Sequence, residues 1–165
     1  MEAPKVKTLM AVLDDDTSRP ATQQEIVDIA REYLSARLRR GRTLNSPSTT
    51  RDFLSLRLGD LDHEVFAVIY LDTRNRLIDY QVMFRGTIDG VAVHPREVVK
   101  EALKLNAASV IFAHPRPSGV AEPCHADEAI NERLKRALGL LDIRVLDYIL
   151  IGGGHTVSMA ERGLV

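Results

Sequence analysis

The segment His114–Asp127 contains the side chains best suited to catalysis or metal binding. It reads HPRPSGVAEPCHAD and holds His114, Cys124, His125 and Asp127. A hydrolytic zinc ion takes three N, O or S ligands from the protein and keeps a position for water, while a nearby carboxylate acts as general base. The segment therefore has the residue types of a zinc hydrolase. A strand-end histidine bonded to a backbone carbonyl is nevertheless the commoner setting for a single His.

One metal-site signature can be set aside. Pro123-Cys124 resembles the second half of the P-C-x-x-C pattern of zinc deaminases. The pattern is not completed, because Asp127 stands where the second cysteine belongs and no His-x-Glu precedes it. His63 and Glu64 are adjacent, so they point to opposite faces of a strand.

Two elements flank the segment and would position it. Ala108–Ala113 (ASVIFA) is apolar and β-branched enough for a strand buried on both faces, and it runs directly into His114. The prolines and Gly119 that follow predict an irregular loop. Apolar residues at helical spacing then predict a helix over 126–140. Polar groups at such a strand end are held by a rigid framework, which favours a functional site.

The remaining elements predict the fold class. Apolar periodicity predicts helices over 22–41, 46–58 and 95–105, and strands over 64–71, 77–84, 143–151 and 156–159. The turn residues Asp72–Asn75 join the first two strands as a hairpin. This order predicts an α/β (α+β) fold with a mixed β-sheet flanked by helices. Residues 1–20 are expected to form a flexible arm or an oligomer-exchange segment.

Length, charge and composition limit the cellular location and the binding partners that can be expected. The 165 residues suit a single compact domain, and 22 basic against 23 acidic residues give a net charge of -1. Nucleic acid is disfavoured as a partner, because only a local patch could bind it, such as Arg37, Arg39, Arg40 and Arg42. The single cysteine, the lack of a signal-peptide pattern and the lack of an apolar run of ~18 residues predict a cytoplasmic protein without a membrane segment.

Residues 63–165 resemble the RadC-type branch of the JAB/MPN (JAMM) family. The resemblance is carried by EVFAVIYLDTRNRLI (Glu64–Ile78), FRGTIDGVAVHPREVVKEALKLNAASVIFAH (Phe84–His114), PSG (Pro117–Gly119) and LGLLDIRVLDYILIGGG (Leu138–Gly154). It implies a JAB/MPN, cytidine deaminase-like domain over 61–165 behind lead-in helices over 21–60. The sequence is similar to short family members without the N-terminal helix-hairpin-helix region.

The family's metal pattern is an upstream Glu, then His-x-His, seven residues, Ser, two residues and Asp. Carried over by position, it implies Glu64 as general base, His114 and Asp127 as zinc ligands, and Cys124 at the serine position that stabilises the oxyanion. The second His position is Arg116. A guanidinium cannot ligate zinc, because it stays protonated and offers no lone pair. It could instead form ion pairs with both carboxylates.

Three functions follow from the resemblance. The first is a zinc-dependent metallopeptidase or isopeptidase acting on a protein or peptide substrate, with Cys124 or His125 as a substitute for the lost ligand. The second is a non-catalytic MPN scaffold or binding module, because a fold does not determine a function. Such a module could assemble as a homo-oligomer. The third takes the family's DNA-repair label literally and would need the arginine patch to bind phosphate.

Overall fold

The computed structural model describes residues 9–12, 17–37, 41, 43–44, 47–87 and 90–165. From residue 46 onward, each predicted helix and strand is present, with ends within two residues of the prediction. In chain order the elements are β1 (Met10–Val12), β2 (Ser18–Pro20), α1 (Gln23–Arg37), α2 (Pro47–Leu58), β3 (Val65–Leu71), β4 (Leu77–Arg85), α3 (Pro95–Lys104), β5 (Ser109–Pro115), α4 (His125–Gly139), β6 (Arg144–Gly152) and β7 (His155–Ser158).

A five-stranded mixed sheet forms the centre of the molecule, with strand order β4-β3-β5-β6-β7. Strand β3 pairs antiparallel with both β4 and β5, β5 pairs parallel with β6, and β6 pairs antiparallel with β7. The predicted α/β fold with a mixed sheet flanked by helices is therefore confirmed.

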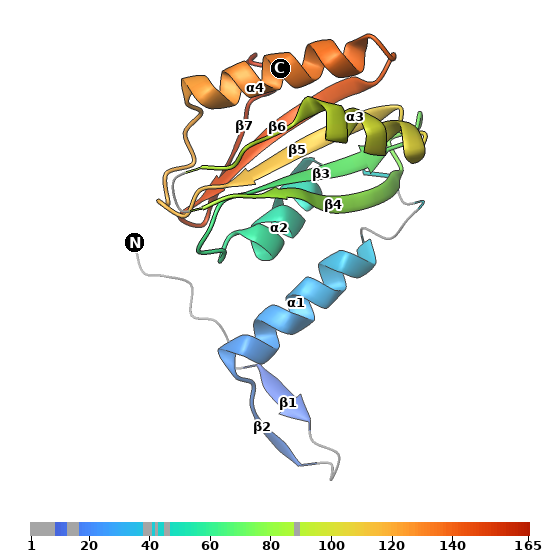
Figure 1. Ribbon diagram of the computed structural model, residues 1–165. Coiled ribbons are helices and arrows are strands. Elements are labelled where there is room, and N and C mark those ends of the chain that lie inside the picture. Colours follow the sequence, from blue (N-terminus) through green and yellow to red (C-terminus); the bar gives the residue numbers. More distant parts are fainter. Residues whose placement is uncertain (1–8, 13–16, 38–40, 42, 45–46, 88–89) are drawn as a thin grey trace.

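Helices cover both faces of the sheet, which explains the unbroken apolar strands. Helices α3 and α4 lie on one face and α2 on the other (Figure 1). Along β3, Phe66, Val68 and Tyr70 face the first layer, whereas Ala67 and Ile69 pack toward α2. Each side chain of β3 is buried, as expected of a central strand with both faces covered.

The connection β5-α4-β6 places a loop and the start of α4 near the carboxyl end of β5. Two parallel strands cannot be joined by a tight turn, so the chain crosses over through α4. Residues 116–124 form the loop before that helix. The loop turns at Gly119, whose φ of +82° favours glycine, and a Cβ on Gly153 would lie 2.7 Å from the Gly119 carbonyl oxygen. This close approach fixes the loop against the β6-β7 turn.

The described part of the N-terminal region contains a short pair of strands, and the prediction of a flexible arm over residues 1–20 stays a prediction. Met10–Val12 pairs antiparallel with Ser18–Pro20, and this hairpin extends away from the central sheet (Figure 1). Helix α1 contacts α2, and the Arg31 guanidinium donates to the Leu56 carbonyl oxygen. Ile29 and Tyr33 of α1 are 64% and 62% exposed.

The described part of α1 ends at Arg37, and residues 38–40 of the predicted 22–41 helix lie outside the described residues. None of the helices in the described ranges is long and apolar enough to span a bilayer.

Candidate functional site

Three elements bring the candidate site residues together: the start of β3, the end of β5 and the first turn of α4. In the β3-β5 pairing Ala67 lies opposite Ala113 and Val68 opposite Phe112. Extending this antiparallel register beyond the strand ends places Glu64 opposite Arg116. The backbone N–H of Arg116 also donates to the Ile151 carbonyl oxygen over 2.7 Å. Two residues far apart in sequence thus meet because of strand register.

His114 is the buried centre of the site. Its Nε2 lies 3.0 Å from Glu64 Oε2, and its Nδ1 lies 3.0 Å from the Tyr148 hydroxyl and 3.3 Å from Asp127 Oδ1. Tyr148 comes from β6, opposite Phe112 of β5, and its side chain packs on the α4 face of the sheet. Both ring nitrogens of His114 are therefore engaged by oxygen atoms of other side chains.

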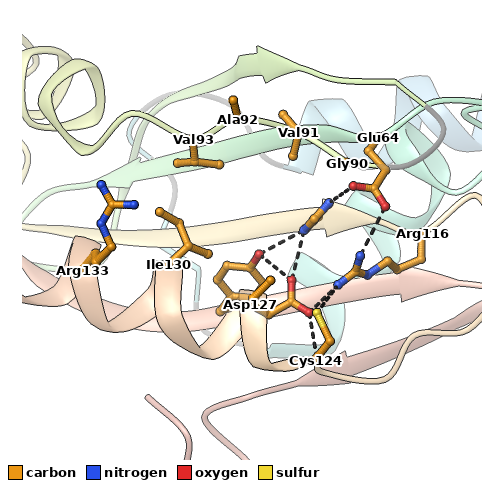
Figure 2. A pocket seen from close by; sticks show the side chains of 13 residues that line it. Glu64, Gly90, Val91, Ala92, Val93, Arg116, Cys124, Asp127, Ile130 and Arg133 are labelled. Carbon is orange, nitrogen blue, oxygen red and sulfur yellow. Dashed lines mark hydrogen bonds and ion pairs between the residues drawn. The ribbon is translucent and has the colours of Figure 1, made fainter.

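Arg116 links the two carboxylates. Its Nη1 donates to Glu64 Oε1 over 3.2 Å, and its Nη2 donates to Asp127 Oδ2 and lies 3.3 Å from Cys124 Sγ. Figure 2 shows the Arg116 guanidinium pointing between Glu64 on one side and Asp127 with Cys124 on the other. The interaction is shielded from water, because the carboxylate side chains are 7% and 3% exposed and that of Arg116 is 17% exposed.

Asp127 anchors the first turn of α4 as well as the cluster. Its Oδ2 accepts the backbone N–H of Cys124, the residue before the helix, over 2.9 Å. Its Oδ1 accepts the hydroxyl of Tyr148 over 3.1 Å. An acidic residue in the first turn also complements the helix dipole. Both carboxylate oxygens of Asp127 therefore accept hydrogen bonds, although the residue is almost fully buried.

The electrostatics of the cluster favour the charged forms of Asp127 and Arg116. Burial alone raises the pKa of Asp127, but its interactions with His114, with Cys124 and with the Arg116 charge outweigh burial and hold that pKa well below its usual range. Burial lowers the pKa of Arg116, yet Asp127, Cys124 and Glu64 together raise it. Burial, with the charge of Asp127, holds the pKa of Tyr148 well above its ordinary value.

The arrangement does not fit the zinc ion that the family resemblance implies. Within the described ranges no group of three or more His, Cys, Asp or Glu side chains is placed to hold a metal. Arg116 donates from the position of the second His ligand, and His114 turns both nitrogens to protein oxygens. His125, the possible substitute, is exposed at the start of α4 and does not line the site pocket.

A groove of about 480 Å³ opens next to the cluster. His114 and Tyr148 are among its lining residues. One wall is α4, and the other wall is the segment Gly90–Val93 (Figure 2). Ile130 and Arg133 of α4 line it at a distance from the ion pairs (Figure 2). The volume lies within the range of ordinary ligand sites.

Sequence reasoning named Glu64, His114, Arg116, Cys124 and Asp127, and the structure places these side chains around one pocket. Their proposed roles in catalysis and metal binding stay predictions. Sequence reasoning missed Tyr148, Arg133 and the Gly90–Val93 wall. Tyr148 was detectable in principle, because it is the polar-tipped residue of the buried strand DYILI that runs beside His114.

A mixed sheet with this crossover, and a cluster of His and acidic side chains at the strand ends, is consistent with a JAB-type domain. The model of the RadC-like JAB domain matches residues 44–164, and the chain belongs to this family. The match includes all five residues of the predicted site.

The chain is also similar to three curated bacterial relatives. A UPF0758 protein of Marinobacter nauticus is 56% identical over 149 residues, which is 90% of this chain and 66% of the relative. A UPF0758 protein of Nitrosococcus oceani is 54% identical over 86% of this chain and 63% of the relative. UPF0758 protein Tgr7_0100 of Thioalkalivibrio sulfidiphilus is 53% identical over 90% and 66%. The chain therefore spans slightly less than two thirds of the length of these relatives.

Proposed function

We propose that this RadC-like JAB domain is a non-hydrolytic binding module for a protein or peptide segment, in which the Arg116 guanidinium takes the place of the family's zinc. The observation that carries the proposal is the contact of Arg116 with both Glu64 and Asp127. These are the positions that the resemblance assigns to the general base and to a metal ligand. The groove beside them would be the binding surface.

The cost of adding a metal supports the proposal. Two unit charges 4 Å apart interact by about 4 kcal/mol at an effective dielectric constant of 20, so a dication at that distance from Arg116 would be repelled by about 8 kcal/mol. Structural zinc sites gain roughly 10–16 kcal/mol from all their ligands together. Repulsion by Arg116 would remove about half or more of that gain even with a full ligand set, and Arg116 also replaces one ligand.

A second candidate is a zinc-dependent hydrolase with a rearranged set of ligands. It is favoured by one contact, because Cys124 Sγ and Asp127 Oδ2 both touch the same nitrogen of Arg116. If the Arg116 side chain moved out, Cys124, Asp127 and His114 would face a common space. Thiolate, carboxylate and imidazole are all acceptable zinc ligands.

The zinc content of the purified protein distinguishes these candidates. We expect far less than one zinc per chain for the wild type after exchange into zinc-containing buffer, and close to one for Arg116→His. The combination of Arg116→His with His125→Ala serves as a control and should bind as much zinc as Arg116→His alone. Near-equimolar zinc in the wild type that is lost in Cys124→Ala would overturn the proposal and establish the second candidate.

The DNA-repair and nucleic-acid prediction has no support in the site. Arg39, Arg40 and Arg42 of the patch lie outside the described residues, as does the side chain of Arg37. The net charge of -1 supplies no general attraction to phosphate.

A further inference from the structure

The groove beside the ion-pair cluster carries a charge that no described residue neutralises. Arg133 lines the groove and is exposed, and it has no ion-pair or hydrogen-bond partner among the described residues. By contrast, Arg136 on the same helix pairs with Glu132 over 2.7 Å. Arg116 at the opposite end is likewise paired. Arg133 is therefore the free cation of the groove within the described part of the chain.

The spacing along α4 explains why Arg133 points into the groove. Ala126, Ile130 and Arg133 are related by four and three residues, which places them on one face of a helix. Figure 2 shows Ile130 between Arg133 and the cluster. Six residues at 1.5 Å of rise separate Arg133 from Asp127, which is about 9 Å along the helix axis. An extended peptide covers that distance with about three residues.

The wall opposite α4 has backbone groups that form no hydrogen bond with the part of the chain that the structure describes. Among the described residues, no backbone N–H or C=O of Val91, Ala92 or Val93 hydrogen-bonds to another part of the chain. The side chains of Val91 and Val93 are half-buried, and together with Ile130 they make the middle of the groove apolar. Free backbone groups beside an apolar strip suit a peptide in extended conformation, which pairs through its main chain.

We propose that the groove binds an extended acidic peptide, with a Glu or Asp carboxylate on Arg133 and an apolar side chain against Val91 and Ile130. The acidic residue would lie about three residues from the one that reaches the Arg116 cluster. This inference rests on the binding function proposed above and names the chemical class of the ligand. Arg133 would determine specificity and would take no part in bond breaking.

The test is an NMR titration of the full chain with defined peptides at millimolar concentration. The probes are the acetylated amides Glu-Val-Ser-Val-Ser and Ser-Val-Ser-Val-Glu, which cover both chain directions, and the same peptides with Gln in place of Glu. We expect one Glu peptide to bind about fivefold more tightly than its Gln counterpart, the size of one exposed charge pair. The amide signals of Val91–Val93 should shift.

Matched variants isolate the contribution of Arg133. In Arg133→Gln the preference for Glu over Gln should disappear, while Arg136→Gln, the same change one turn away, should keep it. Equal affinity for the Glu and Gln peptides, no binding of any peptide, or an equal loss in both variants would overturn the inference. So would equally tight binding of acetyl-glutamate amide, because that would indicate a small-anion site.

The peptide titration and the zinc measurement test the two proposals separately. Zinc content and the Arg116→His variant test whether the guanidinium replaces the metal. The peptide titration compares ligands on wild-type protein, so it can fail while the zinc result stands, and the reverse also holds.

Discussion

Replacing Arg116 by alanine should destabilise the domain by about 3 kcal/mol at neutral pH, because breaking a buried ion pair from one side typically costs 3–5 kcal/mol. The substitution leaves Glu64 and Asp127 buried without their shared cation. We expect the lower end of that range, since the Arg116 side chain is 17% exposed and water can enter the space it vacates.

An exposed ion pair provides the matched control. Arg51 pairs with Glu161 over 2.8 Å, with side chains that are 26% and 58% exposed. Arg51→Ala removes the same charged group from the same domain, yet exposed pairs contribute only about 0–1 kcal/mol. The difference between the two variants measures the effect of burial on the carboxylates, separate from the change in net charge.

The destabilisation should depend on pH in a defined direction. The pKa of Asp127 in the folded wild type lies below its unfolded value, so Asp127 contributes stability above the unfolded pKa of about 3.9 and loses it as pH falls through the folded value. Without Arg116 the pKa of Asp127 rises, and protonation then relieves the buried charge. The stability gap between wild type and Arg116→Ala should therefore narrow as pH falls from the folded pKa of Asp127 in the variant to its lower folded pKa in the wild type, by at most about 1.4 kcal/mol per pH unit for one proton.

Urea unfolding of wild type, Arg116→Ala and Arg51→Ala from neutral to acid pH measures the stability loss in each variant and how the loss in Arg116→Ala depends on pH. A loss in Arg116→Ala no larger than in Arg51→Ala, or a gap that does not change with pH, would refute the reasoning that Arg116 neutralises buried carboxylates. Adding zinc extends the assay to the second candidate function. If His114, Cys124 and Asp127 bind zinc once Arg116 is gone, stability should recover by about 2.7 kcal/mol at a zinc concentration of 100 Kd.

Two further substitutions test the surroundings of the cluster. Tyr148→Phe removes the hydroxyl between His114 and Asp127, and we expect a loss of about 1–2 kcal/mol in urea unfolding. The loss should be constant from about pH 6 to 9, because burial keeps the pKa of Tyr148 far above the usual value of about 10; a loss that varies there would show that the hydroxyl titrates. Cys124→Ser should raise stability by up to about 1 kcal/mol, because serine is a better residue than cysteine immediately before a helix. Destabilisation in the Ser variant would show that the thiol contact with Arg116 outweighs the helix cap.

The elements of the central domain were predictable because their signals are local. Strands such as Val65–Leu71 are apolar at every position, and α4 follows a proline-rich loop and begins with acidic residues. Such patterns need no knowledge of distant residues. The pairing of β1 with β2 was missed because each strand has only three residues, too few for an alternating pattern, and the second strand, Ser18–Pro20, has no large apolar side chain to mark it.

The geometry of the site depends on pairings that local patterns do not contain. Glu64 meets Arg116 only because β3 runs antiparallel to β5 in one particular register, and Tyr148 reaches His114 only because β6 lies beside β5. A shift of one residue in either pairing would turn these side chains to the other face of the sheet. Family resemblance supplied Glu64 in advance, whereas Tyr148 and Arg133 have no position in the family's metal pattern and required the structure.

A metal ion and a guanidinium meet the same electrostatic demand of this fold in different ways. Two carboxylates buried at a strand end and a helix start need a nearby cation, and either group can provide it. A zinc ion also keeps an open position and acidifies bound water. The guanidinium directs its N–H groups to Glu64, Asp127 and Cys124 and has no lone pair for a substrate oxygen. Under the proposed function, an Arg at the position where the family pattern has its second His would preserve the stability of the domain and would remove the metal chemistry that the family resemblance implies. The groove beside it, where Arg133 has no partner among the described residues, would then be the part of the site still able to select a ligand.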